Sequence, residues 1–328
     1  MASLVRVTLF LLTIGLFLLA APIAPADNGG FTPVTPESKN AEAIRDSYVF
    51  LSIFALAIFL LVEGLLVWFV LRFRRRRRGR FEDGAPIHGS TRLELAWTVA
   101  PVLVLVAIAT FLFVKLPKIT DVPEAEAGQR LEILVSGRQF YWQYEYPNGV
   151  IAIDRMRAPA GVPVRLEITA PDGDVIHSWW IPALGGKIDA IPGTVTESWF
   201  EVDDPGVYTG QCAELCGLVH AQMLASVEIL PEDEFEAWLA ERRTRQSGDA
   251  SALGEEVWEG ACAKCHGLGG EGGIGPRLAG SAVLTDADAL ESIVRNGRGD
   301  MPAVGADWSE EQMRALTSYL EENPPSGQ

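Results

Sequence analysis

The chain has 328 residues, enough for two or three domains, and its 43 acidic and 27 basic residues give a formal net charge of −16. Its four cysteines all lie in two short motifs, so none is left for a structural disulfide. Its four histidines are too few to build a histidine-rich catalytic metal cluster.

The first 26 residues are expected to form a secretory signal peptide. A short apolar run at residues 7–20 follows Arg6 and precedes a small-x-small cleavage pattern at Ala24 and Ala26. An uncleaved third membrane helix is the alternative. Residues 27–46 would then be the outer N-terminal segment of the mature chain.

Two longer apolar runs, at residues 48–71 and 95–116, predict a transmembrane helical hairpin over residues 47–117. Each run can cross a bilayer core of about 30 Å at about 1.5 Å per residue of helix. Seven arginines lie between the runs, at residues 72–80, and they indicate a cytoplasmic loop in the bacterial inner membrane. Their place between two spans favours this topology over nucleic-acid binding, and no nucleic-acid partner is expected.

Residues 118–241 are expected to form an all-β domain, a sandwich or a barrel. The expected strands alternate polar with β-branched or other apolar residues, and glycine and proline separate them. These strands lie at residues 131–135, 164–169, 207–210 and 225–230. A helix from residue 231 would close the domain, and a polar linker is expected at residues 242–249.

The first cysteine motif lies in the β domain and predicts a copper centre. Cys212 and Cys216 are followed by His220 and Met223, and His177 lies upstream. Such a set of soft sulfur and nitrogen ligands selects copper, with zinc as the alternative. One copper would leave one cysteine over, whereas two coppers bridged by both thiolates use the whole set.

The second motif predicts a c-type haem. Cys262 and Cys265 are spaced so that both thiols can attach to one porphyrin, and His266 follows as an axial ligand. A zinc site would need a second ligand pair, and a thioredoxin-like pair would need a βαβ setting. Met301, in a glycine-rich turn, is the expected second axial ligand, and Met313, inside a helical pattern, is the alternative.

The haem motif lies in an expected small all-α domain, residues 250–328. Helical patterns cover residues 252–258 and 309–320, and Ser309 with Gln312 matches a capping box. From Asp249 onward the chain has 14 acidic and 5 basic residues, a net charge of −9. An acidic surface attracts basic partners, so a basic electron donor is expected, although solubility also explains the charge.

Residues 45–241 resemble subunit II of haem–copper cytochrome c oxidases. The resemblance is carried by the segments at residues 174–179, 187–193 and 210–217, and a c-type domain behind this module is similar to the caa3-type oxidases. It implies a cupredoxin-like β domain with a binuclear CuA centre. The implied copper ligands are His177, Cys212, Glu214 through its carbonyl oxygen, Cys216, His220 and, weakly, Met223.

The resemblance also implies contacts with subunit I. The Glu214 side chain would reach a magnesium site shared with that subunit, and Asp189 would lie at the interface. Glu94 would stand at the cytoplasmic entrance of a proton channel, with an interfacial charge as the alternative. Tyr141 and Trp142 are the aromatic residues expected to take part in electron transfer.

One position departs from the family pattern. Phe140 stands where the family has the tryptophan through which electrons usually arrive from soluble cytochrome c. This puts direct docking of a soluble donor on the β domain in doubt. A tethered haem would make that route less necessary.

The implied function is electron transfer within an enzyme complex, with no catalytic residue in this chain. Electrons from cytochrome c or a bc1-type donor would reach haem c, pass to CuA and continue to subunit I, where O2 is reduced to water with proton translocation. Subunits I and III and the lipid bilayer are the other expected partners. A nitric oxide reductase subunit and a copper-delivery protein are the alternatives. Too few histidines exclude nitrous oxide reductase, and the intact ligand set excludes a quinol oxidase subunit.

Overall fold

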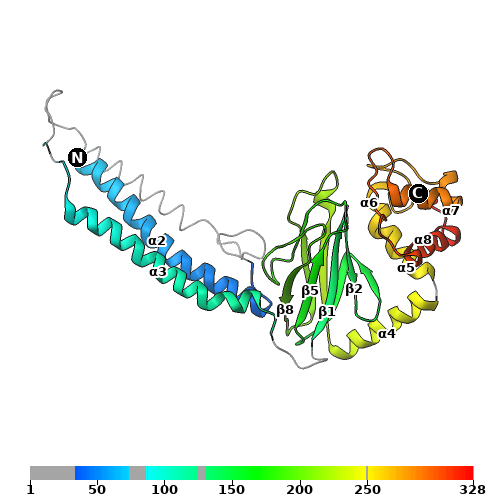
Figure 1. Ribbon diagram of the computed structural model, residues 1–328, viewed down its shortest axis with the longest axis horizontal. Coiled ribbons are helices and arrows are strands. Elements are labelled where there is room, and N and C mark those ends of the chain that lie inside the picture. The colour runs from blue at the N-terminus through cyan, green and yellow to red at the C-terminus, as the bar shows by residue number, and fades with distance from the viewer. Residues whose placement is uncertain (1–33, 74–85, 87, 124–129, 249, 328) are drawn as a thin grey trace, which may run out of the picture.

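The computed structural model describes residues 34–73, 86, 88–123, 130–248 and 250–327. A helical hairpin, a β-sandwich and a small helical domain follow one another along the chain (Figure 1). This arrangement confirms the expected fold class. The predicted signal peptide and most of the arginine-rich loop lie outside the described residues.

The hairpin consists of α2 (Lys39–Phe73) and α3 (Thr91–Thr120), and both helices are long and apolar enough to cross a membrane. Near one end, Lys115 Nζ lies 2.6 Å from Asp46 Oδ2, and the rings of Phe50 and Phe111 stack with centroids 3.9 Å apart. Both helices extend beyond the expected spans. Helix α2 begins before its apolar run, and Asn40 in its first turn is buried.

Those first turns attach the hairpin to the sandwich. Asn40 Nδ2 donates to the carbonyl oxygen of Trp199 at 2.6 Å, and Ser38 Oγ donates to that of Leu184 at 2.7 Å. The Trp199 indole in turn donates to the carbonyl oxygen of Ile119, at the end of α3, at 3.1 Å. Both helices are therefore fixed to the β domain through Trp199, and α2 also through the bond to Leu184.

The β domain consists of two five-stranded sheets, ordered β3-β2-β1-β5-β8 and β4-β10-β9-β6-β7. The strands are β1 (Leu131–Arg138), β2 (Tyr141–Glu145), β3 (Ile151–Ile153), β4 (Arg155–Pro159), β5 (Val164–Thr169), β6 (His177–Trp180), β7 (Ile188–Ala190), β8 (Thr196–Phe200), β9 (Gly206–Cys212) and β10 (Leu224–Leu230). The pairs β1–β5 and β4–β10 are parallel, and the other pairs are antiparallel. All four strands expected from the sequence are present.

The two faces of strand β2 contribute to two different hydrophobic cores. Trp142 and Tyr144 are fully buried among the side chains between the two sheets. Tyr141, on the opposite face because successive strand residues alternate, is also fully buried, but among residues of the helical domain. The outer face of β2 is thus covered by the C-terminal domain.

The helical region begins with α4 (Glu232–Gly248), which continues through most of the segment expected as a linker. The small domain then contains α5 (Ala250–Val257), a π-helical turn η2 (Trp258–Cys262), α6 (Ala263–His266), a 3-10 turn η3 (Ala282–Thr285), α7 (Ala287–Asn296) and α8 (Glu310–Glu322). Ser309 and Gln312 form the predicted capping box at the start of α8.

Candidate metal centres

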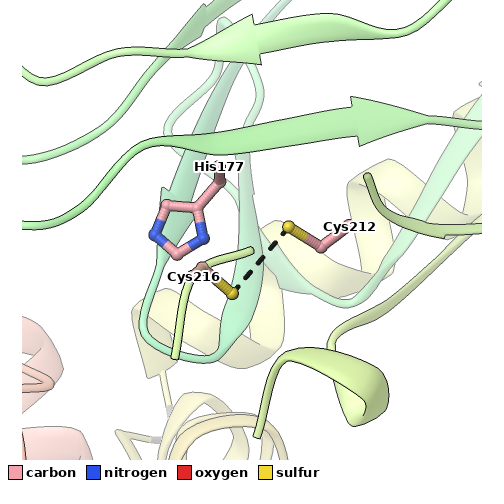
Figure 2. Close-up of side chains that lie close together, drawn as sticks. All are labelled: His177, Cys212 and Cys216. Carbon is pink, nitrogen blue, oxygen red and sulfur yellow. Dashed lines mark hydrogen bonds between the residues drawn. The ribbon is translucent and has the colours of Figure 1, made fainter. Parts of the chain in front are cut away.

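The first candidate centre lies at one end of the sandwich, where neighbouring strands begin and end. His177 is the first residue of β6 and Cys212 the last of β9, and these strands pair. Cys216 follows on the loop toward β10. Figure 2 shows the three side chains pointing toward one another, and their ligand atoms all lie within 4.8 Å of one another.

The other predicted copper ligands surround the two sulfurs. Cys212 Sγ lies 3.9 Å from Cys216 Sγ and 3.2 Å from the carbonyl oxygen of Glu214. Cys216 Sγ lies 3.5 Å from His220 Nδ1 and 3.8 Å from Met223 Sδ. The five predicted ligand side chains therefore gather around one position, with the Glu214 carbonyl oxygen beside Cys212.

The donor set suits a copper ion. His177 Nδ1 is buried and has no hydrogen-bond partner among the described residues, while its Nε2 lies 3.3 Å from Asp174 Oδ1. A buried nitrogen left free beside thiol and thioether sulfurs is what a soft metal ion requires, and an orienting carboxylate on the other ring nitrogen is typical of metal-binding histidines.

The two thiols have unlike acidities. The hydrogen bond between the sulfurs lowers the pKa of Cys212 well below its usual range, whereas that contact and burial raise the pKa of Cys216. Burial opposes charging of His177, but Asp174 raises the pKa of its ring. One thiolate is thus favoured in the folded chain, and thiolate is the form that binds metal.

Residues of the β1–β2 turn support the metal loop from the side. Gln139 Nε2 donates to the carbonyl oxygen of Cys216 at 2.8 Å. Gly217 has φ +129°, and a Cβ there would lie 3.0 Å from Phe140 Cε1. The Trp142 ring meets the His177 ring edge-on at 6.1 Å between centroids.

Two of these supporting residues were not found by sequence reasoning. Asp174 could have been found from its place three residues before a predicted histidine ligand. Gln139 gives no comparable signal, because its contact depends on the packing of distant segments.

The second candidate centre is the cysteine–histidine motif of the helical domain. Cys262 ends the π-helical turn, and Cys265 and His266 lie on α6. His266 Nδ1 donates to the carbonyl oxygen of Pro276 at 2.8 Å, which leaves Nε2 free for iron. A Cβ on Gly275 would lie 2.7 Å from His266 Cε1, so a glycine is needed beside the ring.

The two candidate methionines differ in their surroundings. Met301 is half-buried in a turn whose backbone bonds to Arg298 at 3.0 and 3.1 Å. Met313 is 4% exposed and packs in the domain core with Leu316. Met313 is thus packed as a core residue, and Met301 stays the predicted iron ligand.

Three further predicted sites are Glu94, Asp189 and the side chain of Glu214. Asp189 pairs with Ser178, next to His177, and Glu214 lies on the copper loop. Glu94 is exposed in the first turn of α3, where its Oε1 accepts from the Ser90 backbone N–H at 3.3 Å. The carbonyl oxygen of Asp189 accepts from Thr196 Oγ1 at 2.7 Å. The Glu214 side chain is exposed, so it is open to a partner subunit.

The fold and the two motifs define a class: a membrane-anchored electron-transport protein with a cupredoxin-like domain and a c-type cytochrome domain. Family models described as "Cytochrome C oxidase subunit II, transmembrane domain" and "Cytochrome C oxidase subunit II, periplasmic domain" match residues 32–114 and 150–230. A model described as "Cytochrome C oxidase, cbb3-type, subunit III" matches residues 249–320.

Similar proteins agree with these matches. Cytochrome c oxidase subunit 2 of Alkalihalophilus pseudofirmus is 36% identical over 314 residues, covering 88% of this chain and 90% of that protein. A probable cytochrome c oxidase subunit 2 of Rickettsia bellii is 36% identical over 247 residues, covering 68% and 88%. The chain therefore belongs to the cytochrome c oxidase subunit II family.

A solved structure, the periplasmic domain of subunit II of cytochrome oxidase (CoxB) of Bradyrhizobium japonicum, is 33% identical, covering 38% of this chain and 98% of that one, with a TM-score of 0.35. Because this score is low, family membership is based on the sequence matches. Membership makes the chain a subunit of a haem–copper oxidase, with copper in the β domain, haem in the helical domain, and oxidase subunits and a cytochrome c donor as partners. It also makes the chain a membrane protein with a periplasmic domain.

Proposed function

We propose that this chain is the electron-receiving subunit of a caa3-type cytochrome c oxidase. Electrons would arrive at haem c, pass to a binuclear CuA centre and continue to subunit I, where reduction of O2 to water is coupled to proton translocation. The observation that carries this proposal is the gathering of the predicted copper ligands on a domain that also holds the haem-motif domain against its side.

The chain's residues have distinct tasks in this proposal. His177, Cys212, Glu214, Cys216, His220 and Met223 would hold two coppers, and Cys262, Cys265, His266 and Met301 would hold one haem. When bound, each of these groups takes up and releases one electron at a time. Asp174 and the Pro276 carbonyl keep one histidine in each site in a fixed orientation.

The surroundings of the copper loop suit a large partner. Leu215 and Leu218 are each 77% exposed next to the metal ligands, and Glu214 is exposed between them and Cys212. Apolar side chains exposed together favour a protein interface. We therefore place subunit I against this loop, with a shared magnesium ion at Glu214 and with Asp189 at the contact.

The same proposal assigns the membrane topology. The arginine-rich loop would lie in the cytoplasm, and Glu94, close to that side on α3, would stand at the entrance of a proton channel in subunit I. The acidic helical domain would receive a basic donor, a cytochrome c or a bc1-type complex.

The test is a spectroscopic and metal analysis of the full chain, produced with haem attachment and copper loading. One haem and two coppers per chain are expected, with an EPR signal whose hyperfine splitting comes from both copper nuclei. A single copper, a zinc ion, or copper lost to a mild chelator would contradict the CuA assignment.

A further inference from the structure

The helical domain lies beside the β2 side of the sandwich and contacts it through side chains, in addition to the covalent connection through α4 (Figure 1). The Tyr141 hydroxyl accepts from Trp308 Nε1 at 2.7 Å and donates to the carbonyl oxygen of Val304 at 3.2 Å. Gln312 Nε2 donates to Gln143 Oε1 at 3.0 Å, and both side chains are buried. Buried polar contacts of this kind require one relative placement of the two domains.

The backbone of the helical domain also packs closely against a side chain of β3. A Cβ built on Gly260, in the turn before Cys262, would lie only 2.1 Å from Ile153 Cγ2 on β3. Arg138, 5% exposed and the cross-strand partner of Tyr141, pairs with Asp307 of the helical domain. The contact therefore combines close packing at Gly260 with an ion pair at Arg138.

Lys264 takes part in the contact and lies inside the haem motif itself, between Cys262 and Cys265. Its Nζ donates to the carbonyl oxygen of Phe140 at 2.9 Å and lies 2.5 Å from Asp154 Oδ2. Asp154 Oδ1 accepts from the backbone N–H of Trp142 at 3.0 Å. The ammonium group therefore joins the haem motif to Phe140, in the β1–β2 turn, and to Asp154, between β3 and β4.

The β1–β2 turn, residues 139 and 140, also contacts the copper loop. The Phe140 ring lies against Gly217, and Gln139 bonds to the carbonyl oxygen of Cys216. Cys265, next to Lys264, packs against the same side-chain cluster that contains Cys212 and Cys216. Phe140 thus contacts both the haem motif and the copper loop.

We propose that Lys264 is a positioning residue that fixes the haem-attachment motif relative to the copper loop through Phe140 and Asp154. This inference rests on the proposed function, in which both motifs carry electron-transfer centres. The rate of electron transfer depends on the distance between the two centres. A helical domain held in one position keeps that distance constant, whereas a mobile domain would not. The Asp154 carboxylate favours this one position of the helical domain, because removing Lys264 would leave a largely enclosed negative charge without its cation.

The experiment uses the assembled oxidase and compares wild type with Lys264→Met. The distribution of distances between the oxidised haem and the copper centre is measured by pulsed EPR, and hydrogen exchange is followed in peptides spanning residues 138–146 and 258–268. We expect one narrow distance in the wild type. In Lys264→Met we expect a broadened distribution and exchange at least about tenfold faster in both peptides.

Two further variants complete the test. Arg314→Met removes an exposed positive charge from α8 of the same domain and should match the wild type in both measurements. Asp154→Asn keeps an acceptor for the Trp142 N–H and removes the charge that faces Lys264, so it should broaden the distribution even if Lys264→Met does not assemble.

The two proposals fail in different ways. A narrow, unshifted distance with unchanged exchange in both Lys264→Met and Asp154→Asn would overturn the positioning role and leave the proposed function intact. A wild-type protein without the copper or haem signal would overturn the proposed function instead.

Discussion

At the scale of single residues, each candidate centre has one histidine whose second ring nitrogen is held by the chain. Asp174 holds His177 and the carbonyl oxygen of Pro276 holds His266. Such partners fix both the tautomer and the direction of the ring, and they tune how strongly the free nitrogen donates. They are therefore as open to test as the ligands themselves.

Asp174→Asn should weaken copper binding without removing a ligand. Loss of the carboxylate that orients His177 is expected to reduce copper affinity by about 10- to 100-fold. Competition with a graded series of copper chelators measures this change. Asp172→Asn, which alters an exposed carboxylate two residues away, is the control, and equal affinities for the two variants would contradict the orienting role.

Met301→His should lower the reduction potential of the haem. A thioether ligand raises the potential of a haem relative to a second imidazole, so exchange of the ligand lowers it. Redox titration followed in the visible spectrum measures the shift. Met313→Leu, a change inside the domain core, should leave the potential as it is, and a fall in that variant alone would identify Met313 as the ligand.

At the scale of elements, the sequence predicts the helices, strands and ligand loops more completely than the contacts between the domains. Alternation finds the strands, and ligand spacing brings Cys212, Cys216 and His220 together because a single loop carries them. The role of Tyr141 cannot be predicted in this way, since an aromatic residue on an outward strand face suits an exposed edge as well as a domain contact. The polar composition after residue 241 suggests a linker, but α4 continues there, and arginine and glutamate are compatible with an exposed helix.

Gly260→Ala should disturb the contact between the helical domain and β3. The added methyl group would meet Ile153, and such overpacking typically costs about 1–3 kcal/mol. Denaturant unfolding of the full chain, followed by haem absorbance, measures the loss. Ile153→Ala combined with Gly260→Ala should recover part of it, and a wild-type midpoint for Gly260→Ala would contradict the close approach.

At the scale of the whole molecule, each domain is fixed to the next. Asn40 and Trp199 join the hairpin to the sandwich, and Lys264 joins the sandwich to the helical domain. Phe140, at the position where the resemblance places the usual entry of electrons, is only 8% exposed. Its ring belongs to the core of the sandwich, and its carbonyl oxygen is bonded to Lys264 of the helical domain. Under the proposed function, we expect a soluble donor to meet the chain on the helical domain.

That placement predicts a strong dependence of electron uptake on salt. The chain from Asp249 onward carries 14 acidic and 5 basic residues, so a basic cytochrome c should be attracted to it. The attraction reaches about 30 Å at 0.01 M ionic strength and about 10 Å at 0.1 M, so the second-order rate of electron uptake should fall steeply between these conditions. Stopped-flow mixing with reduced basic cytochrome c measures the rate, and an uncharged small reductant, whose rate should not change, is the control. A rate with the basic donor that stays constant or rises with salt would show that the acidic helical domain does not receive it.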